Sequence, residues 1–128
     1  MILLDTCTLL WLARGEGLSP RAAEVITNSE NGLFVSSISA MEIGTKMAKG
    51  KLVLPRPLRE WWATVVEQHG MGEVPVEVEI AIASTQLPPI HGDPFDRLLI
   101  ATAGHLGATL LTPDAHIRSY PGLHTVWD

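Results

Sequence analysis

Short apolar runs alternate with longer amphipathic segments along the whole chain. The runs at residues 2–4, 33–36 and 109–112 end beside polar residues, as buried strands of a parallel sheet do. Weaker runs at residues 73–76 and 123–127 are compatible with two further short strands. The pattern therefore predicts strands distributed over the full length of the sequence.

The segments between these strands carry helix start and stop signals. Asp93-Pro94 pairs a capping residue with proline at the first helical position, and Gly107 follows the last apolar residue of that segment. Thr6 and Ser39 are the expected caps of two other helices. The expected helices cover residues 8–14, 20–28, 39–49, 58–69, 78–86 and 94–106.

The alternation of strands and helices indicates the fold class. It predicts an α/β protein, a three-layer α/β/α sandwich around a mostly parallel central sheet, with residues 1–128 in a single domain. In such sheets the ligand crevice lies beyond the carboxyl ends of the strands. Polar residues that directly follow a strand are therefore the first candidates for function.

The composition sets limits on this picture. The chain has 128 residues, of which 46% are hydrophobic and 18% charged, so a folded core is expected rather than disorder. The single cysteine excludes an intrachain disulfide. No secretory signal pattern is found and no apolar stretch is long enough to cross a bilayer, so we expect a cytoplasmic protein without membrane association.

The formal net charge of −5 argues against a protein that holds nucleic acid by bulk electrostatics. It does not exclude a nuclease, because acidic side chains that hold metal ions count as negative until the metal binds. Basic residues concentrate in one segment and form either a solvated helix end or a patch that contacts phosphate. They are Lys46, Lys49, Lys51, Arg56 and Arg59.

Several acids lie at expected strand ends or first helical turns, and each has a structural alternative. Asp5 follows the first strand and could cap the next helix, although Thr6 could take that position instead. Asp114 follows a strand and could be a turn or capping residue. Asp93 is the natural cap of the helix that Pro94 opens, and Asp96 lies in its first turn, where the helix dipole favours an acid.

Glu42 has two structural explanations. Ser39 and Glu42 have the spacing of a capping box, in which the glutamate reaches back to the amide of the cap residue. Lys46 stands four residues further on, where a helical ion pair is worth about 0.3–0.5 kcal/mol. Taken alone, Glu42 is explained by these contacts.

The expected position of these acids on one rim of the sheet changes the interpretation. Carboxylates packed together repel one another, and such a cluster is tolerated chiefly when a cation neutralises it. An all-oxygen site suits magnesium or manganese, and the chemistry it indicates is phosphodiester hydrolysis. The candidate metal ligands are Asp5, Glu42, Asp96 and Asp114.

Other chemistries find less support. The five histidines include no His-x-x-x-His pair and lack cysteine partners, so a zinc site is not expected and they are assigned to the surface or to loops. No glycine-rich phosphate loop of the Walker type is present. Cys7, at a helix start beside a buried strand, is expected to be a packed residue rather than a nucleophile.

Four segments of the chain resemble the motifs of PIN-domain proteins, and their order and spacing look like those of the VapC toxins of bacterial toxin–antitoxin pairs. They are residues 2–6, 35–43, 91–101 and 110–114, and together they extend over nearly the whole chain. The resemblance implies a PIN-like fold and a magnesium- or manganese-dependent endoribonuclease that acts on single-stranded RNA. It also implies a homodimer and a small antitoxin partner that blocks the site and binds operator DNA.

The resemblance also assigns roles to individual residues. Thr112 would be the hydroxyl that orders the site, with Thr6 as a further candidate, and Asp93 would be an accessory acid. Pro113 departs from the motif and could change the direction of Asp114. The catalytic quartet that would bind magnesium or manganese is Asp5, Glu42, Asp96 and Asp114.

Two other classes of protein stay open. A phosphatase of the haloacid dehalogenase type also begins with a strand and an aspartate, but it needs a second aspartate two residues later, where this chain has Cys7. A non-catalytic α/β module would use the same rim only to bind a metal or a partner. The presence of all four acids favours the enzyme over this module.

Overall fold

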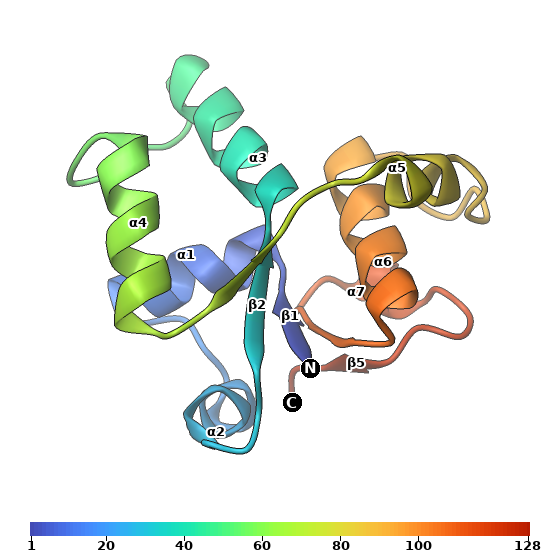
Figure 1. Cartoon of the computed structure of the whole chain (residues 1–128), viewed down its shortest axis with the longest axis horizontal. Helices are drawn as coiled ribbons and strands as arrows, with labels where there is room; N and C mark the ends of the chain where they lie inside the picture. Colours follow the sequence, from blue (N-terminus) through green and yellow to red (C-terminus); the bar gives the residue numbers. More distant parts are fainter.

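The computed structural model describes residues 1–128, which form a central sheet between two layers of helices (Figure 1). The sheet has the strand order β3-β2-β1-β4-β5, and every neighbouring pair is parallel. The strands are β1 (Ile2–Leu4), β2 (Leu33–Ser36), β3 (Gly72–Val74), β4 (Thr109–Leu111) and β5 (Thr125–Val126). The helices are α1 (Thr6–Arg14), α2 (Pro20–Thr27), α3 (Ser37–Ala48), α4 (Leu58–Gln68), α5 (Val78–Thr85), α6 (Pro94–Leu106) and α7 (Ala115–Arg118). None of these helices has the length and apolar character needed to cross a membrane.

The path of the chain across the sheet reverses once. From β1 the chain adds β2 and then β3 on one side, and it then crosses back to add β4 and β5 on the other side. Connections between parallel strands of one sheet are right-handed. Helices before and after the reversal therefore cover opposite faces of the sheet. Figure 1 shows α1 and α4 on one side of the sheet and α6 and α7 on the other. The reversal point lies between β1 and β4, where ligand crevices of parallel sheets form.

Each face of the sheet has its own hydrophobic core. Side chains alternate along β1, so Leu4 lies in one core with Leu9 of α1 and Trp61 of α4, whereas Leu3 lies in the core of the other face with Leu99 of α6. Leu3, Leu4 and Leu99 have no exposed surface. The predicted three-layer sandwich is confirmed, and its sheet is entirely rather than mostly parallel.

Helix α3 joins the two layers at the carboxyl edge of the sheet. It begins directly after the last residue of β2, without a loop. Its Ile38 belongs to the core on the α6 side, and its Ile43 belongs to the core on the α1 and α4 side. The helix therefore packs against α1, α4 and α6 together. This position carries Glu42 over the ends of the strands.

The start of α3 differs from the sequence-based expectation. Ser36, the last residue of β2, is the cap, and its hydroxyl accepts a hydrogen bond from the amide of Ile38. Ser39 lies inside the helix, and its hydroxyl accepts a hydrogen bond from the Thr6 hydroxyl at 2.9 Å. The predicted capping box of Ser39 and Glu42 is therefore wrong, because the strand runs into the helix and its own last serine caps it.

The start of α1 also differs from the expectation. Asp5 is the cap, since its Oδ1 accepts a hydrogen bond from the amide of Thr8 at 2.8 Å, and Thr6 is already the first helical residue. The alternative in which Thr6 caps this helix is wrong. The other expected helices and all five strands are present. The short helix α7 was missed, because four residues show no helical periodicity.

Candidate functional site

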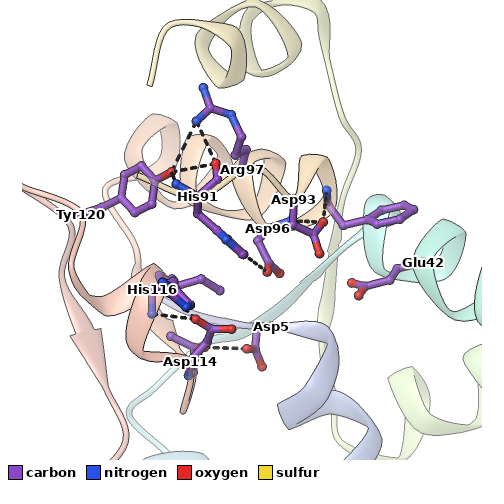
Figure 2. A network of polar contacts seen from close by, with 12 residues as sticks. Asp5, Glu42, His91, Asp93, Asp96, Arg97, Asp114, His116 and Tyr120 are labelled. Carbon is purple, nitrogen blue, oxygen red and sulfur yellow. Dashed lines mark hydrogen bonds and ion pairs between the residues drawn. The ribbon is translucent and has the colours of Figure 1, made fainter. Parts of the chain in front are cut away.

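A pocket of about 280 Å³ opens at the carboxyl edge of the sheet, beside the ends of β1 and β4. Figure 2 shows acidic side chains that approach this space from the end of β1, from α3 and from the first turns of α6 and α7. One lysine, Lys46, also lines it. All the predicted metal ligands and the predicted accessory acid meet here: Asp5, Glu42, Asp93, Asp96 and Asp114.

Asp5 and Thr112 connect the ends of β1 and β4. Asp5 is buried, and its Oδ2 accepts a hydrogen bond from the Thr112 hydroxyl at 2.6 Å while its Oδ1 caps α1. The same hydroxyl accepts a hydrogen bond from the amide of Asp114 at 3.1 Å. Thr112 itself is fully buried. One threonine therefore fixes one acid through its side chain and the next through its backbone.

Like Asp5, two further acids cap helices and line the pocket at the same time. Oδ1 of Asp114 accepts hydrogen bonds from the amides of His116 and Ile117 at the start of α7. Oδ1 of Asp93 accepts a hydrogen bond from the amide of Phe95 at 2.8 Å at the start of α6. The capping roles expected from the sequence are thus present, and the Oδ2 atoms stay available to the pocket. Pro113 lines the same pocket and does not turn the acid that follows it away.

Glu42 brings a buried oxygen without a partner to this pocket. The residue is only 7% exposed, and its Oε2 lies 3.2 Å from Nζ of Lys46. Its Oε1 has no hydrogen-bond partner. Leaving a buried carboxylate oxygen unpaired is unfavourable, and a cation bound beside it would remove that cost. Of the two structural explanations for Glu42, only the ion pair with Lys46 exists.

The residues present fit a divalent cation. Five carboxylates face one lysine, so the pocket has an excess of negative charge that a cation would neutralise. Side-chain ligand atoms of His91, Asp93 and Asp96 lie within 4.8 Å of one another. A donor set made mainly of carboxylate oxygens suits magnesium or manganese.

The crowding of the acids changes their titration. Burial raises the pKa of Asp5 above its ordinary value, against the hydrogen bonds from Thr112 and Thr8 that lower it. Burial raises the pKa of Asp96 to about 6, and the charges of Asp93, Glu42 and Asp114 add to this effect, while the hydrogen bond with His91 opposes it. The metal-free site thus disfavours full ionisation, as expected for a site completed by a cation.

A stability measurement tests the raised pKa of Asp96. Because the folded state holds this proton more tightly, Asp96 contributes stability below its ordinary pKa of 3.8, and that contribution is lost as pH rises through about 6. Without metal, wild type should therefore lose stability relative to Asp96→Asn as pH rises from 3.8 to about 6. The difference in free energy of unfolding, variant minus wild type, should grow over this pH range. Urea unfolding at a series of pH values measures the difference. A difference that stays constant with pH would show that the carboxyl titrates normally.

Two residues at the pocket were not recognised as site residues from the sequence. His91 lies in a loop as expected, but its Nε2 is 2.8 Å from Oδ2 of Asp96. Its place two residues before the cap of α6 was the available signal.

Lys46 lines the acidic pocket, whereas Arg59 lines a second pocket between α3 and α4 and Arg56 contacts Thr64. The basic segment therefore does not form one continuous patch at the site.

Cys7 lines the pocket but is not prepared for nucleophilic chemistry. Burial raises the pKa of its thiol to about 11, and the neighbouring charge of Asp5 acts in the same direction. The thiol is therefore protonated near neutral pH. The position where a haloacid dehalogenase would need its second aspartate thus holds a neutral side chain.

Fold and pocket together define the class of the protein: an α/β/α sandwich with an acidic site suited to divalent cations at its sheet edge. A family model described as PIN domain matches residues 2–123. The sequence is 32% identical over 130 residues to ribonuclease VapC22 of Mycobacterium tuberculosis, with 98% of each chain covered. The chain therefore belongs to the PIN-domain family.

Solved structures show the same fold at lower sequence identity. VapBC2 from Rickettsia felis, bound to a DNA fragment from its promoter, matches with a TM-score of 0.71 and 19% identity over 100% of both chains. DNA-bound VapBC from Salmonella typhimurium matches with a TM-score of 0.68 and 19% identity, over 98% of this chain and 96% of the other. These similarities support the assignment of the fold.

Proposed function

We propose that this chain is a metal-dependent endoribonuclease that hydrolyses phosphodiester bonds of single-stranded RNA, with residues 1–128 acting as one PIN-like nuclease domain. The observation that carries the proposal is the convergence of four carboxylates on a pocket in which a buried oxygen of Glu42 lacks a partner. The relative in Mycobacterium tuberculosis, named as a ribonuclease and aligned over 98% of the chain, supports the choice of RNA as substrate.

The residues of the pocket divide into those that hold the cation and those that hold its ligands. Asp5, Glu42, Asp96 and Asp114 would hold magnesium or manganese, with Asp93 as an accessory acid. A divalent cation in such a site supplies activated water and stabilises the charge that develops on the phosphate. Thr112 is proposed to fix Asp5 and the backbone of Asp114 through the two hydrogen bonds that it forms.

Lys46 has a proposed role toward the substrate. Its Nζ pairs with Glu42 at 3.2 Å, while 46% of the side chain stays exposed at the rim of the pocket. An ammonium group in this position would attract a phosphate toward an otherwise negative site. The exposed lysines and arginines further along the segment are not needed for this role.

The direct test uses a circular single-stranded RNA, which has no ends for an exonuclease. Purified protein should linearise it in the presence of Mg²⁺ or Mn²⁺ and leave it intact in EDTA, because the carboxylates alone cannot activate water for this attack. Adding back the cation should restore cleavage. Identical products in EDTA would rule out the metal mechanism, and metal binding without cleavage would favour the non-catalytic module.

Metal binding should also stabilise the fold. If the four carboxylates bind the cation, Mn²⁺ at a hundred times its dissociation constant should raise the free energy of unfolding by about 2.7 kcal/mol through linkage. A double variant with asparagine at Asp5 and Asp96 should lose this response. Thermal melts with and without Mn²⁺ measure it. An unchanged response in the double variant would place the metal elsewhere.

We further infer that the protein is the toxin of a toxin–antitoxin pair, with a small antitoxin as its partner. The structural neighbours named as VapBC complexes, two of them DNA-bound, support this inference. Growth arrest on expression of this chain, relieved by co-expression of a small antitoxin protein that binds it, would test this inference. The homodimer and the cytoplasmic location stay predictions.

A further inference from the structure

One guanidinium group holds the loop between α5 and α6. Arg97 of α6 donates hydrogen bonds to the backbone oxygens of Ser84, Leu87, Pro88 and His91 at 2.9–3.2 Å. These oxygens belong to the last turn of α5 and to the loop that follows it, so one side chain of α6 joins both to its own helix. The concentration of these contacts on one planar side chain therefore fixes the shape of the loop rather than merely satisfying its polar groups.

The same loop is attached to the segment after α7 through Tyr120. This tyrosine is buried, and its hydroxyl accepts a hydrogen bond from the amide of His91 at 2.9 Å and lies 3.2 Å from its backbone oxygen. Arg97 also reaches the tyrosine hydroxyl, at 3.4 Å. Both polar groups of the His91 backbone are thus held by residues from two different parts of the chain, as Figure 2 shows.

The imidazole ring of His91 is held from a second direction. It lies parallel to the ring of His116 in α7, with 5.3 Å between ring centroids and 9° between ring planes. This arrangement directs Nε2 to Oδ2 of Asp96 at 2.8 Å. No other side chain forms a hydrogen bond with the Asp96 carboxylate. The direction in which that carboxylate points therefore depends on the histidine.

We propose that His91 is a positioning residue, which fixes the carboxylate of Asp96 toward the pocket and is itself held in place by Arg97 and Tyr120. The proposal rests on the proposed function, because the direction of this carboxylate matters only if it binds the cation. Partners that orient a ligating carboxylate typically contribute about 10–100-fold in metal affinity or activity. His91 thus acts through Asp96 without touching the substrate.

A pair of variants separates this role from two others. His91→Phe keeps an aromatic ring that can stack on His116 but lacks the N–H group. His91→Gln gives up the ring, yet it carries an amide N–H at the distance from the backbone at which Nε2 lies. A positioning role requires the N–H group, a metal ligand requires the imidazole, and a packing role requires the ring.

The measurement is the affinity of the metal-free full-length chain for Mn²⁺ by titration calorimetry, with no RNA present. We expect His91→Phe to lose about 10–100-fold in affinity and His91→Gln to recover most of it. Melting temperatures without metal should stay close to wild type in both. Tyr120→Phe, which keeps the buried ring and removes the hydroxyl, should weaken Mn²⁺ binding in the same direction by a smaller factor.

The outcomes that overturn the proposal are distinct from those that overturn the function. Wild-type affinity in His91→Phe would show that the histidine does not position the ligand. Equal loss in His91→Phe and His91→Gln would make the imidazole itself a metal ligand and would also overturn the proposal. A wild-type chain that binds no Mn²⁺ would overturn the proposed function as well, whereas a wild type that binds Mn²⁺ and cuts RNA leaves the function standing whatever the variants do.

Discussion

Asp96→Asn should abolish metal-dependent RNA cleavage while it leaves the protein folded and, without metal, no less stable than wild type. The carboxylate is half-buried and repelled by its neighbours, which raises its pKa to about 6, so removing the charge relieves the metal-free site. In the proposed mechanism the same charge would hold the cation, and a catalytic cation supplies several kcal/mol of transition-state stabilisation. Cleavage should therefore fall by about 10²–10⁴-fold, since about 1.36 kcal/mol corresponds to a factor of ten.

Single-turnover cleavage and urea unfolding of the same preparations measure both effects. Asp93→Asn is the matched control on the same helix, because asparagine caps a helix as well as aspartate does. As an accessory acid, Asp93 should matter less for cleavage than Asp96. Full activity in Asp96→Asn would remove this residue from the proposed quartet. A large loss of stability would instead mean that the carboxylate is structural.

Glu42→Gln should be folded and inactive. The residue does not form a capping box, so the change removes only the ion pair with the partly exposed Lys46, worth about 0.3–0.5 kcal/mol for an i,i+4 helical pair. The unpaired buried Oε1 would be lost as a ligand, because an amide is a much poorer partner for a hard cation than a carboxylate. Cleavage should fall by about 10²–10⁴-fold, for the same reason as in Asp96→Asn.

Two controls separate the possible roles of Glu42. Lys46→Gln breaks the same ion pair and leaves the carboxylate, so a metal-ligand role predicts normal Mn²⁺ affinity in that variant and a weakened affinity only in Glu42→Gln. Ser36→Ala removes the actual cap of α3 and should cost roughly 0.5–2 kcal/mol of stability with little change in metal affinity. An active Glu42→Gln enzyme would reduce the quartet to three acids.

The sequence by itself determined the elements of this fold and their class. Strands such as β1 and β4 are short apolar runs, and α6 is bounded by Asp93-Pro94 and by Gly107, so these signals depend only on neighbouring residues. Alternation of the elements then required a parallel sheet, and the parallel sheet required that Asp5 and Asp114 lie at one edge. The whole acidic quartet could be named on this basis, together with the resemblance to PIN-domain proteins.

Only the tertiary structure decided how the acids are held. Glu42 reaches the pocket because α3 packs against both helical layers through Ile38 and Ile43, and no local pattern reveals a helix that is buried from two sides. The true cap of that helix is Ser36 rather than Ser39, because the strand and the helix share a boundary that the sequence does not mark. Both facts depend on which elements meet in space.

Hydrogen bonds between distant segments likewise depend on which elements meet in space. Thr112 holds Asp5 across 107 positions of the chain. His91, whose ring meets Asp96, has its backbone amide held by Tyr120, 29 positions further along. Periodicity and capping preferences act over a few residues, whereas these hydrogen bonds form only after the sheet has brought the ends of β1 and β4 together with the start of α6. The sequence therefore identified the acids, and tertiary packing determined which side chains orient them.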